Sequence, residues 1–239
     1  MSDNMYDNVK TWNPFKGCLF DCVYCVPTFQ RQAKRQKHIC KRCYRYEPHF
    51  HSDRLKSIPS AETIFVAGNG DISFAKTENI MKIIDAIKDH NKRCSYKMYY
   101  FQSKDPSTFD RFKNELPDNS ILLTTLETDI DKYSDGSVYG DYSKAPSPSK
   151  RIKMFKDIDY PKKVITIEPI MEFSSNFYGE IASLNPMYVW LGFNSKPKSV
   201  KIPEPTEDET QELVNALLYN GIKVRGKTLR DVDVFEPYP

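Results

Sequence analysis

Three cysteines lie close together near the start of the chain, in the segment GCLFDCVYC, at Cys18, Cys22 and Cys25. Thiolates with this spacing can surround one side of a cuboidal iron–sulfur cluster, in which each iron takes one protein ligand, usually a cysteine. Three ligands leave one iron of a [4Fe–4S] cluster open, and that iron can bind a second molecule. A structural zinc site and buried free thiols are the alternatives, but structural zinc takes four ligands. The spacing therefore favours a cluster with an open iron.

A second group of metal-type side chains follows, in which Cys40 and Cys43 precede His49 and His51. Zinc accepts two thiolates and two imidazoles in such an arrangement. On a strand, residues two apart point to the same side, so the two histidines would face one ion. A solvent-facing pair of thiols remains an alternative. Zinc is favoured over a second cluster because only two thiolates are at hand.

The same stretch is strongly basic. From Arg31 to Arg45 the chain has seven Lys or Arg and no acidic residue, although its net charge is only +3. Local positive charge can attract phosphate, and aromatic side chains could stack on bases. The alternatives are a solvated surface and a small aromatic core. The aromatic residues within and beside this run are Phe29, Tyr44, Tyr46 and Phe50.

Length and composition limit the class of protein. A chain of 239 residues suits one domain of barrel size or two small ones. No apolar stretch approaches the ~18 residues of a membrane helix, and the polar start MSDNMYDNVK lacks the apolar core of a signal peptide. Six cysteines in a chain of this length are metal ligands or catalytic groups more often than disulfides. We therefore expect a cytoplasmic protein with no membrane partner.

Short apolar runs rich in Val, Ile and Tyr recur along the chain, as buried parallel strands require. Helical signals separate them: an apolar face from Ile80 to Ile87, a capping box at Thr206 and Glu209, and a weaker pattern over 174–184. Asp105-Pro106 and Ser147-Pro148 are further helix starts. The expected strands cover 8–12, 63–67, 96–101, 121–126, 164–168, 188–192 and 222–224. This alternation, repeated about six times, predicts a parallel sheet that is either open or curled into a barrel.

In α/β barrels the functional groups gather at the carboxyl ends of the strands. Polar residues follow several of the expected strands, and Glu168 within ITIEPIMEF is not needed by a purely structural barrel. The segment 133–148, rich in Ser, Gly, Asp and Pro, is expected to be the longest loop. The candidate binding residues at the strand ends are Gly68, Asn69, Gly70, Asp71, Thr125, Glu127 and Glu168.

The spacing C-x3-C-x2-C, with Tyr24 directly before the last cysteine, resembles the signature of the radical S-adenosylmethionine (radical SAM) superfamily. The resemblance implies a partial (β/α)6 barrel, in which the open iron binds the amino acid end of SAM. Reductive cleavage of SAM then gives a 5′-deoxyadenosyl radical. AGNGD stands where the superfamily has a glycine-rich motif that holds the SAM amino group, with Asn69-Gly70-Asp71 replacing the usual Gly-Gly-Glu. Thr125 and Glu127 stand where ribose-binding residues often lie.

The flanking segments TWNPFKGC, FQSKDP, TTLETD and IEPIMEF resemble a poorly characterised three-Cys-motif radical-SAM-like family of phages, archaea and bacteria. The resemblance runs from Thr11 to about Asp231, and a more distant one is to spore photoproduct lyase. Family members sometimes occur beside a partner protein. The family implies the cofactor chemistry and leaves the substrate open.

These observations predict a single radical SAM domain over 1–239, with a basic, Cys/His-containing insertion over 26–59. We expect an enzyme that carries a [4Fe–4S] cluster on its three clustered cysteines, cleaves SAM and abstracts hydrogen from a nucleic-acid base or nucleotide, in modification or repair. Flavodoxin or ferredoxin would supply the electron. The alternatives are a peptide or small metabolite as substrate, or a non-catalytic metal-binding nucleic-acid module. No catalytic side chain can be named from the sequence.

Overall fold

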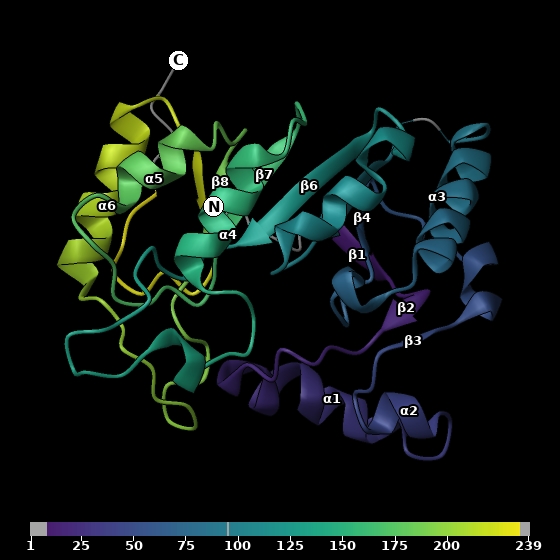
Figure 1. The fold of residues 1–239 in the computed structure, drawn as a ribbon, viewed down its shortest axis with the longest axis horizontal. Helices are drawn as coiled ribbons and strands as arrows, with labels where there is room; N and C mark the ends of the chain where they lie inside the picture. Colours follow the sequence, from purple (N-terminus) through teal and green to yellow (C-terminus); the bar gives the residue numbers. More distant parts are fainter. Residues whose placement is uncertain (1–8, 95, 235–239) are drawn as a thin grey trace.

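Seven parallel strands form one sheet in the structure, a computed structural model that describes residues 9–94 and 96–234 (Figure 1). The order in the sheet follows the chain, and the sheet curves into a partial barrel with β1 and β9 at its edges. The strands are β1 (Val9–Trp12), β4 (Thr63–Val66), β5 (Met98–Gln102), β6 (Ser120–Thr125), β7 (Lys163–Ile167), β8 (Val189–Leu191) and β9 (Val224–Gly226). All the expected strands are confirmed, although β9 begins where its expected range ended, and Asn8 lies outside the described residues.

Helices between the strands cover the outer face of the sheet: α3 (Thr77–Asn91), α4 (Pro148–Asp157), α5 (Phe177–Ser183) and α6 (Glu207–Tyr219). The four isoleucines of the apolar face of α3 are buried, as its spacing predicted, and Met81 is partly buried. At the start of α6, Thr206 and Glu209 cap each other through reciprocal hydrogen bonds of 3.1 and 2.8 Å. No helix in the described part of the chain has the length and apolar character that a membrane span needs.

The prediction of an α-helix after Asp105-Pro106 is wrong. Two short 3₁₀ turns, Pro106–Arg111 and Lys113–Glu115, take its place. Between them Phe112 adopts a non-helical backbone with φ −153°. This break lets the rings of Phe109 and Phe112 pack edge to face, with Phe112 also against Phe101 and both rings buried.

The inner face of the sheet has two halves. Its amino-terminal half is filled by an apolar cluster that includes Tyr100, Leu123 and Val164. Alternate residues of a strand share a face, so Gln102 and Thr125 continue this face toward the carboxyl ends. The apolar cluster therefore forms the floor beneath any site at the carboxyl ends of the strands.

The segment 26–59 has short helical turns and a two-residue strand in place of a β/α unit. It begins with consecutive helical turns from Val26 to Gln36, which include α1 (Arg31–Ala33), and continues with α2 (Lys41–Tyr44). These helices lie below the sheet in Figure 1. The strand β3 (His49–Phe50) then pairs antiparallel with β2 (Phe15–Lys16). The insertion is therefore joined to the segment that leads into the three cysteines.

Candidate active site

A cavity of about 510 Å³ opens at the carboxyl ends of the strands. The cysteine loop (residues 18–25) lines one side of it with all three thiols, and the glycine turn (residues 68–71) lines another. Thr125 and Glu168 contribute from β6 and from the end of β7. Nearly all of the strand-end residues picked out from the sequence therefore meet at one place.

The cysteine loop is covered by the segment 133–148, which was expected only to be a loop. The Val23 N–H donates to the Tyr142 carbonyl at 2.9 Å, and the Lys144 N–H donates to the Phe20 carbonyl at 2.7 Å. The sulfur of Cys22 lies 3.1 Å from the Ser143 hydroxyl. Apolar side chains from both segments pack together around Phe20. This cover shields one side of the thiols while the other side faces the cavity.

The three thiols differ in how readily they ionise. A hydrogen bond from Cys25 lowers the pKa of Cys22, and the Lys104 cation lowers it further. The pKa of Cys25 is raised because its thiol donates to Cys22 and is buried. Burial also raises the pKa of Cys18. Since metal ligands are thiolates, a bound cation would be needed to hold all three in the ionised form together.

The glycine turn packs directly on the residue before the cysteine loop. The Gly17 N–H donates to the Asn69 carbonyl at 3.0 Å, and the Asp71 N–H donates to the Gly17 carbonyl at 3.1 Å. A Cβ on Gly70 would lie 2.6 Å from the Gly17 oxygen, so a side chain there would separate the two segments. Glycine at this position lets the turn and the cysteine loop form adjoining walls of the cavity.

Asp71 also lines the cavity, but its carboxylate already has protein donors. It accepts from the Ser73 N–H at 2.9 Å, the Ser103 hydroxyl at 2.7 Å and the Lys104 N–H at 2.9 Å. Burial raises its pKa, although these donors oppose the rise. Asp71 therefore ties the glycine turn to the end of β5.

Glu127 lies behind the cavity wall rather than on it, with no solvent exposure. Its carboxylate contacts the Lys104 ammonium and the Tyr24 hydroxyl, and Arg151 lies 2.7 Å away. Burial alone would raise its pKa, but Arg151 and Lys104 hold the pKa down to about 2. Glu127 therefore anchors Lys104 beside the cysteine loop and holds Tyr24 of the loop itself.

Arg151 was missed as a site residue in the sequence, and Lys104 was recognised only as one of the polar residues that follow an expected strand. Arg151 lies four positions before Phe155 on α4, so helical spacing places it on the buried face, yet its charge is typical of a surface residue. Lys104 follows Gln102 at the end of β5, where a polar side chain has no distinctive pattern. Other cavity-lining residues without a sequence signal are Thr166, Ser195 and Lys227.

Glu168 faces the cavity from the end of β7. Its carboxylate lies 3.6 Å from the Lys227 ammonium. Burial raises the pKa of Glu168, and Lys227 opposes the rise. Glu168 and Lys227 follow β7 and β9, toward one edge of the sheet, whereas the cysteine loop comes after β1 at the other edge. The pair therefore places one acceptor and one cation on the side of the cavity away from the cysteine loop.

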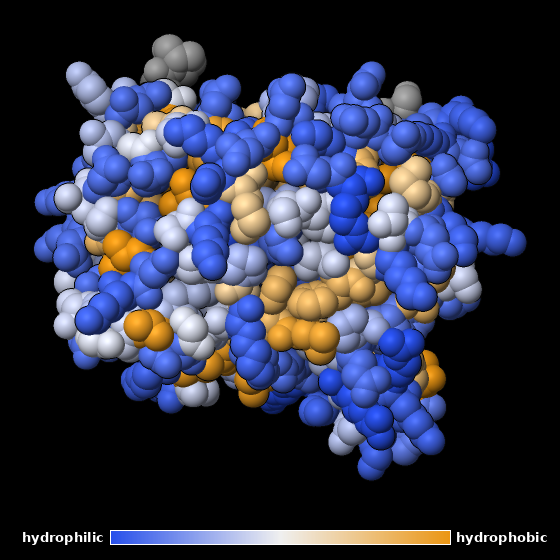
Figure 2. Space-filling model, viewed as in Figure 1, coloured by the Kyte–Doolittle hydropathy of each residue, from blue (hydrophilic) through white to orange (hydrophobic). Residues whose placement is uncertain are grey.

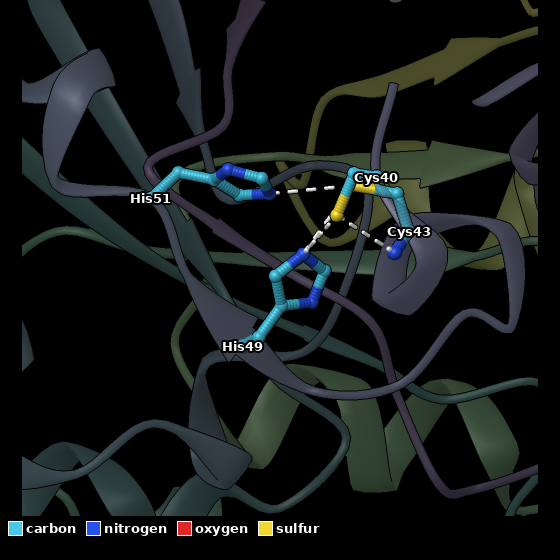
Figure 3. A group of neighbouring side chains, drawn as sticks. All are labelled: Cys40, Cys43, His49 and His51. Carbon is cyan, nitrogen blue, oxygen red and sulfur yellow. Dashed lines mark hydrogen bonds between the residues drawn. The ribbon is translucent and has the colours of Figure 1, made fainter. Parts of the chain in front are cut away.

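A separate group, Cys40, Cys43, His49 and His51, could hold a metal ion (Figure 3). Its four ligand atoms all lie within 4.8 Å of one another. The Cys43 sulfur is 3.3 Å from His49 Nε2 and 3.2 Å from His51 Nε2. The expected common side of the two histidines is thus present. This Cys/His group lies in the insertion, and its members are not among the residues that line the cavity.

No protein-family model and no curated protein matches the chain. Among solved structures, a point mutant of spore photoproduct lyase is similar with a TM-score of 0.54 at 12% identity, over 90% of this chain and 75% of that one. A second mutant of the lyase, with bound AdoMet and a dinucleoside spore photoproduct, has a TM-score of 0.43 at 11% identity, over 86% and 60%. Native anSMEcpe with bound AdoMet and a peptide has 0.44 at 12%, over 91% and 62%. The first likeness shows that the partial barrel of this chain is the fold found in spore photoproduct lyase.

Proposed function

We propose that this chain is a radical SAM enzyme. The observation that carries the proposal is the convergence of three thiols and the glycine turn on one cavity at the carboxyl ends of a partial barrel. A [4Fe–4S] cluster bound there would supply an electron that cleaves SAM, and the 5′-deoxyadenosyl radical would abstract hydrogen from a substrate. An electron donor such as flavodoxin or ferredoxin would reduce the cluster.

The residues around the thiols fit a cluster. Cys18, Cys22 and Cys25 would each ligate one iron, and all three line the cavity, through which a second molecule would reach the open iron. Three thiolates bring negative charge into a buried site, which is costly unless cations lie nearby. The Lys104 ammonium lowers the pKa of Cys22 and opposes the rise at Cys18 and Cys25. Its positive charge favours the ionised thiols.

The rest of the cavity lining would bind SAM. The backbone of the glycine turn would hold the SAM amino group, while Thr125 and Glu168 offer polar atoms for the ribose and the rest of the molecule. In this proposal Asp71 and Glu127 do not bind SAM themselves but hold other groups of the site in place. Asp71 fixes the glycine turn, and Glu127 fixes Lys104 and Tyr24.

For the substrate we propose a nucleic-acid base or nucleotide. All seven basic residues of the run 31–45 are solvent-exposed. The helical turns that carry the first of them also border the cavity, through Thr28, Phe29 and Gln32. Most of the surface of the lobe that contains α2 is hydrophilic in Figure 2. A base must leave a duplex before chemistry on it can occur, and a basic surface beside the cavity would hold the strand. If no nucleic acid binds, a peptide or small metabolite becomes the proposed substrate.

The proposal includes a second metal. Zinc is the ion that commonly takes two thiolates and two imidazoles, and the Cys/His group supplies that set of ligands.

Anaerobic reconstitution with iron and sulfide tests the proposed reaction. The wild type should take up about four irons per chain and form 5′-deoxyadenosine from SAM under reducing conditions. Cys22→Ala should lose both properties. Cys94→Ser, which removes a cysteine that does not line the cavity, is the matched control and should keep both. A protein that binds metal but forms no 5′-deoxyadenosine would instead be a non-catalytic module.

A further inference from the structure

The Cys/His group has the surroundings of a resident metal site. The His49 Nδ1 lies 2.6 Å from the Glu47 carbonyl, so it carries the proton and Nε2 is left to face the sulfurs. The Cys43 N–H donates to the Cys40 sulfur at 3.2 Å. Zinc–sulfur bonds of about 2.3 Å and zinc–nitrogen bonds of about 2.0 Å place S and N roughly 3.5 Å apart in a tetrahedron. The observed separations of 3.2 and 3.3 Å are close to this geometry.

The insertion has little core of its own. Over residues 26–51 the fully buried side chains are Cys43 and His49, two of the four metal-type residues. The ammonium of Lys16, a residue that is only 7% exposed, donates to the Gln36 side chain at 3.4 Å and interacts electrostatically with Cys43. Small segments without a hydrophobic core commonly depend on a structural metal for their fold. The metal would therefore be the main cross-link within this part of the chain.

Backbone contacts run directly from the Cys/His group to the cysteine loop. His49 pairs with Lys16 between β3 and β2. The Tyr46 N–H donates to the Cys43 carbonyl at 3.0 Å, and the Tyr46 carbonyl accepts the Cys18 N–H at 3.3 Å. Two hydrogen bonds thus link a metal-type cysteine to the first cysteine of the proposed cluster.

At this junction Gly17 packs closely against Glu47, beside a cavity of about 160 Å³ that Cys43 and Tyr46 help to line. Gly17 has φ +90°, and a Cβ there would lie 2.2 Å from the Glu47 carbonyl oxygen. Tyr46 also lines the cavity, between the glycine turn and the helical turns of the insertion. A shift of residues 44–48 would therefore move Gly17, Cys18 and one wall of the cavity together.

We infer that zinc bound by Cys40, Cys43, His49 and His51 clamps residues 44–48 against Gly17 and Cys18, so that the cysteine loop accepts its cluster only when zinc is in place. This inference rests on the proposed cluster and the proposed zinc. The dependence runs in one direction, because contacts within 40–51 hold the Cys/His group together without the cysteine loop.

The test compares Cys43→Ser with Cys22→Ala, using zinc alone, then iron and sulfide. His38→Ala and Cys94→Ser are the controls, since His38 is exposed and neither residue belongs to the Cys/His group. The wild type and Cys22→Ala should each bind about one zinc per chain, and Cys43→Ser should not. Hydrogen exchange then reports on the junction. Without zinc the Cys18 N–H should exchange about fivefold faster or more, as loss of one hydrogen bond implies, while α3 and α6 stay protected.

Iron uptake completes the test. Cys43→Ser should take up several-fold less iron than the wild type and both controls, and the wild type stripped of zinc should behave in the same way. Unchanged iron uptake and exchange after zinc removal would overturn the clamp and leave the proposed enzyme standing. A wild type that binds no zinc would overturn the metal site. Zinc-dependent exchange in a wild type that never takes up iron would support the junction and contradict the proposed cluster.

Discussion

Arg151 and Glu127 form an ion pair with no solvent exposure, with 2.7 Å between Nη1 and Oε2. The pair joins α4 to the end of β6, and Glu127 extends it to Lys104 and Tyr24. The position of the cysteine loop therefore depends on a charged residue of a covering helix. Removing one partner of a buried pair leaves the other charge without compensation, which is strongly destabilising.

Arg151→Ala should accordingly lower the free energy of unfolding by about 3–5 kcal/mol. Lys150→Ala is the matched control, because Lys150 precedes Arg151 on the same helix and is exposed. Urea unfolding of both variants measures the difference. Equal unfolding midpoints would mean that the ion pair does not stabilise the fold.

Glu127→Gln should lower the free energy of unfolding by an amount that depends on pH. The folded pKa of Glu127, about 2, lies below its ordinary value of 4.5, so the ionised carboxylate stabilises the fold above pH 4.5. This contribution is lost as pH falls toward the folded pKa. The variant resembles the protonated acid, so its deficit against the wild type should be large at about pH 7 and much smaller at about pH 3. A deficit that is constant over this range would contradict the assignment of charge to Glu127.

Gly17→Ala should impair iron uptake more than Gly136→Ala does. The two glycines have nearly the same positive φ, +90° and +88°, so both substitutions carry a strain of about 1–3 kcal/mol. Only the Gly17 substitution forces a Cβ against the Glu47 carbonyl, whereas no atom lies within 4 Å at Gly136. The iron content of each variant after reconstitution distinguishes the effect of the contact with Glu47 from the effect of backbone strain, which both variants share. Equal iron content in the two variants would show that the contact with Glu47 is unimportant.

Nucleic-acid binding should weaken with salt if the basic run grips phosphates. Each phosphate contact contributes a slope of about −0.9 in log K against log salt for duplex, and about −0.7 for single strands. Changing Lys34, Arg35, Lys37 and Lys41 to Gln should flatten the slope by several such units. Arg42 is left in place because it donates to the Pro48 carbonyl beside the Cys/His group.

The control for charge is a second quadruple variant, in which four exposed lysines of α3 and α4 become Gln: Lys82, Lys150, Lys153 and Lys156. It should retain the wild-type slope. If the wild type binds neither single-stranded nor duplex DNA or RNA at low salt, the basic run is a solvated surface. A peptide or metabolite then becomes the proposed substrate.

The strands could be predicted because each is a short apolar run between helical patterns, and buried parallel strands require that composition. The start of α6 could be predicted because a helix cap also depends only on residues close together in the sequence. The reciprocal hydrogen bonds of Thr206 and Glu209 illustrate this. The helix after Asp105-Pro106 was wrong because packing of Phe112 on Phe101 bends the backbone. That contact joins the turn to the preceding strand and leaves no helical pattern in the sequence.

The site could be predicted only where a strand still determines the direction of a side chain. Thr125 ends β6 and faces the cavity. Glu127 lies two residues further on, where the chain has left the strand and the alternation no longer holds, and it turns behind the wall. Arg151 could not be identified because a charged residue on a helix is usually exposed.

The Cys/His group was identifiable from residue types alone, because few other roles bring two cysteines and two histidines so close together. Its junction with the cysteine loop was not identifiable. The two-residue strands β2 and β3 are too short to show a period, and the Tyr46–Cys18 hydrogen bond involves only backbone atoms.

The most direct test of the central claim is the electron paramagnetic resonance spectrum of the reduced, reconstituted protein before and after SAM is added. An open iron that binds SAM should change the spectrum of the reduced cluster, and neither the signal nor the change should appear in Cys22→Ala. Cys94→Ser should match the wild type. A cluster signal that SAM leaves unaltered, or a full signal in Cys22→Ala, would contradict the assignment of Cys18, Cys22 and Cys25 to a SAM-binding [4Fe–4S] cluster.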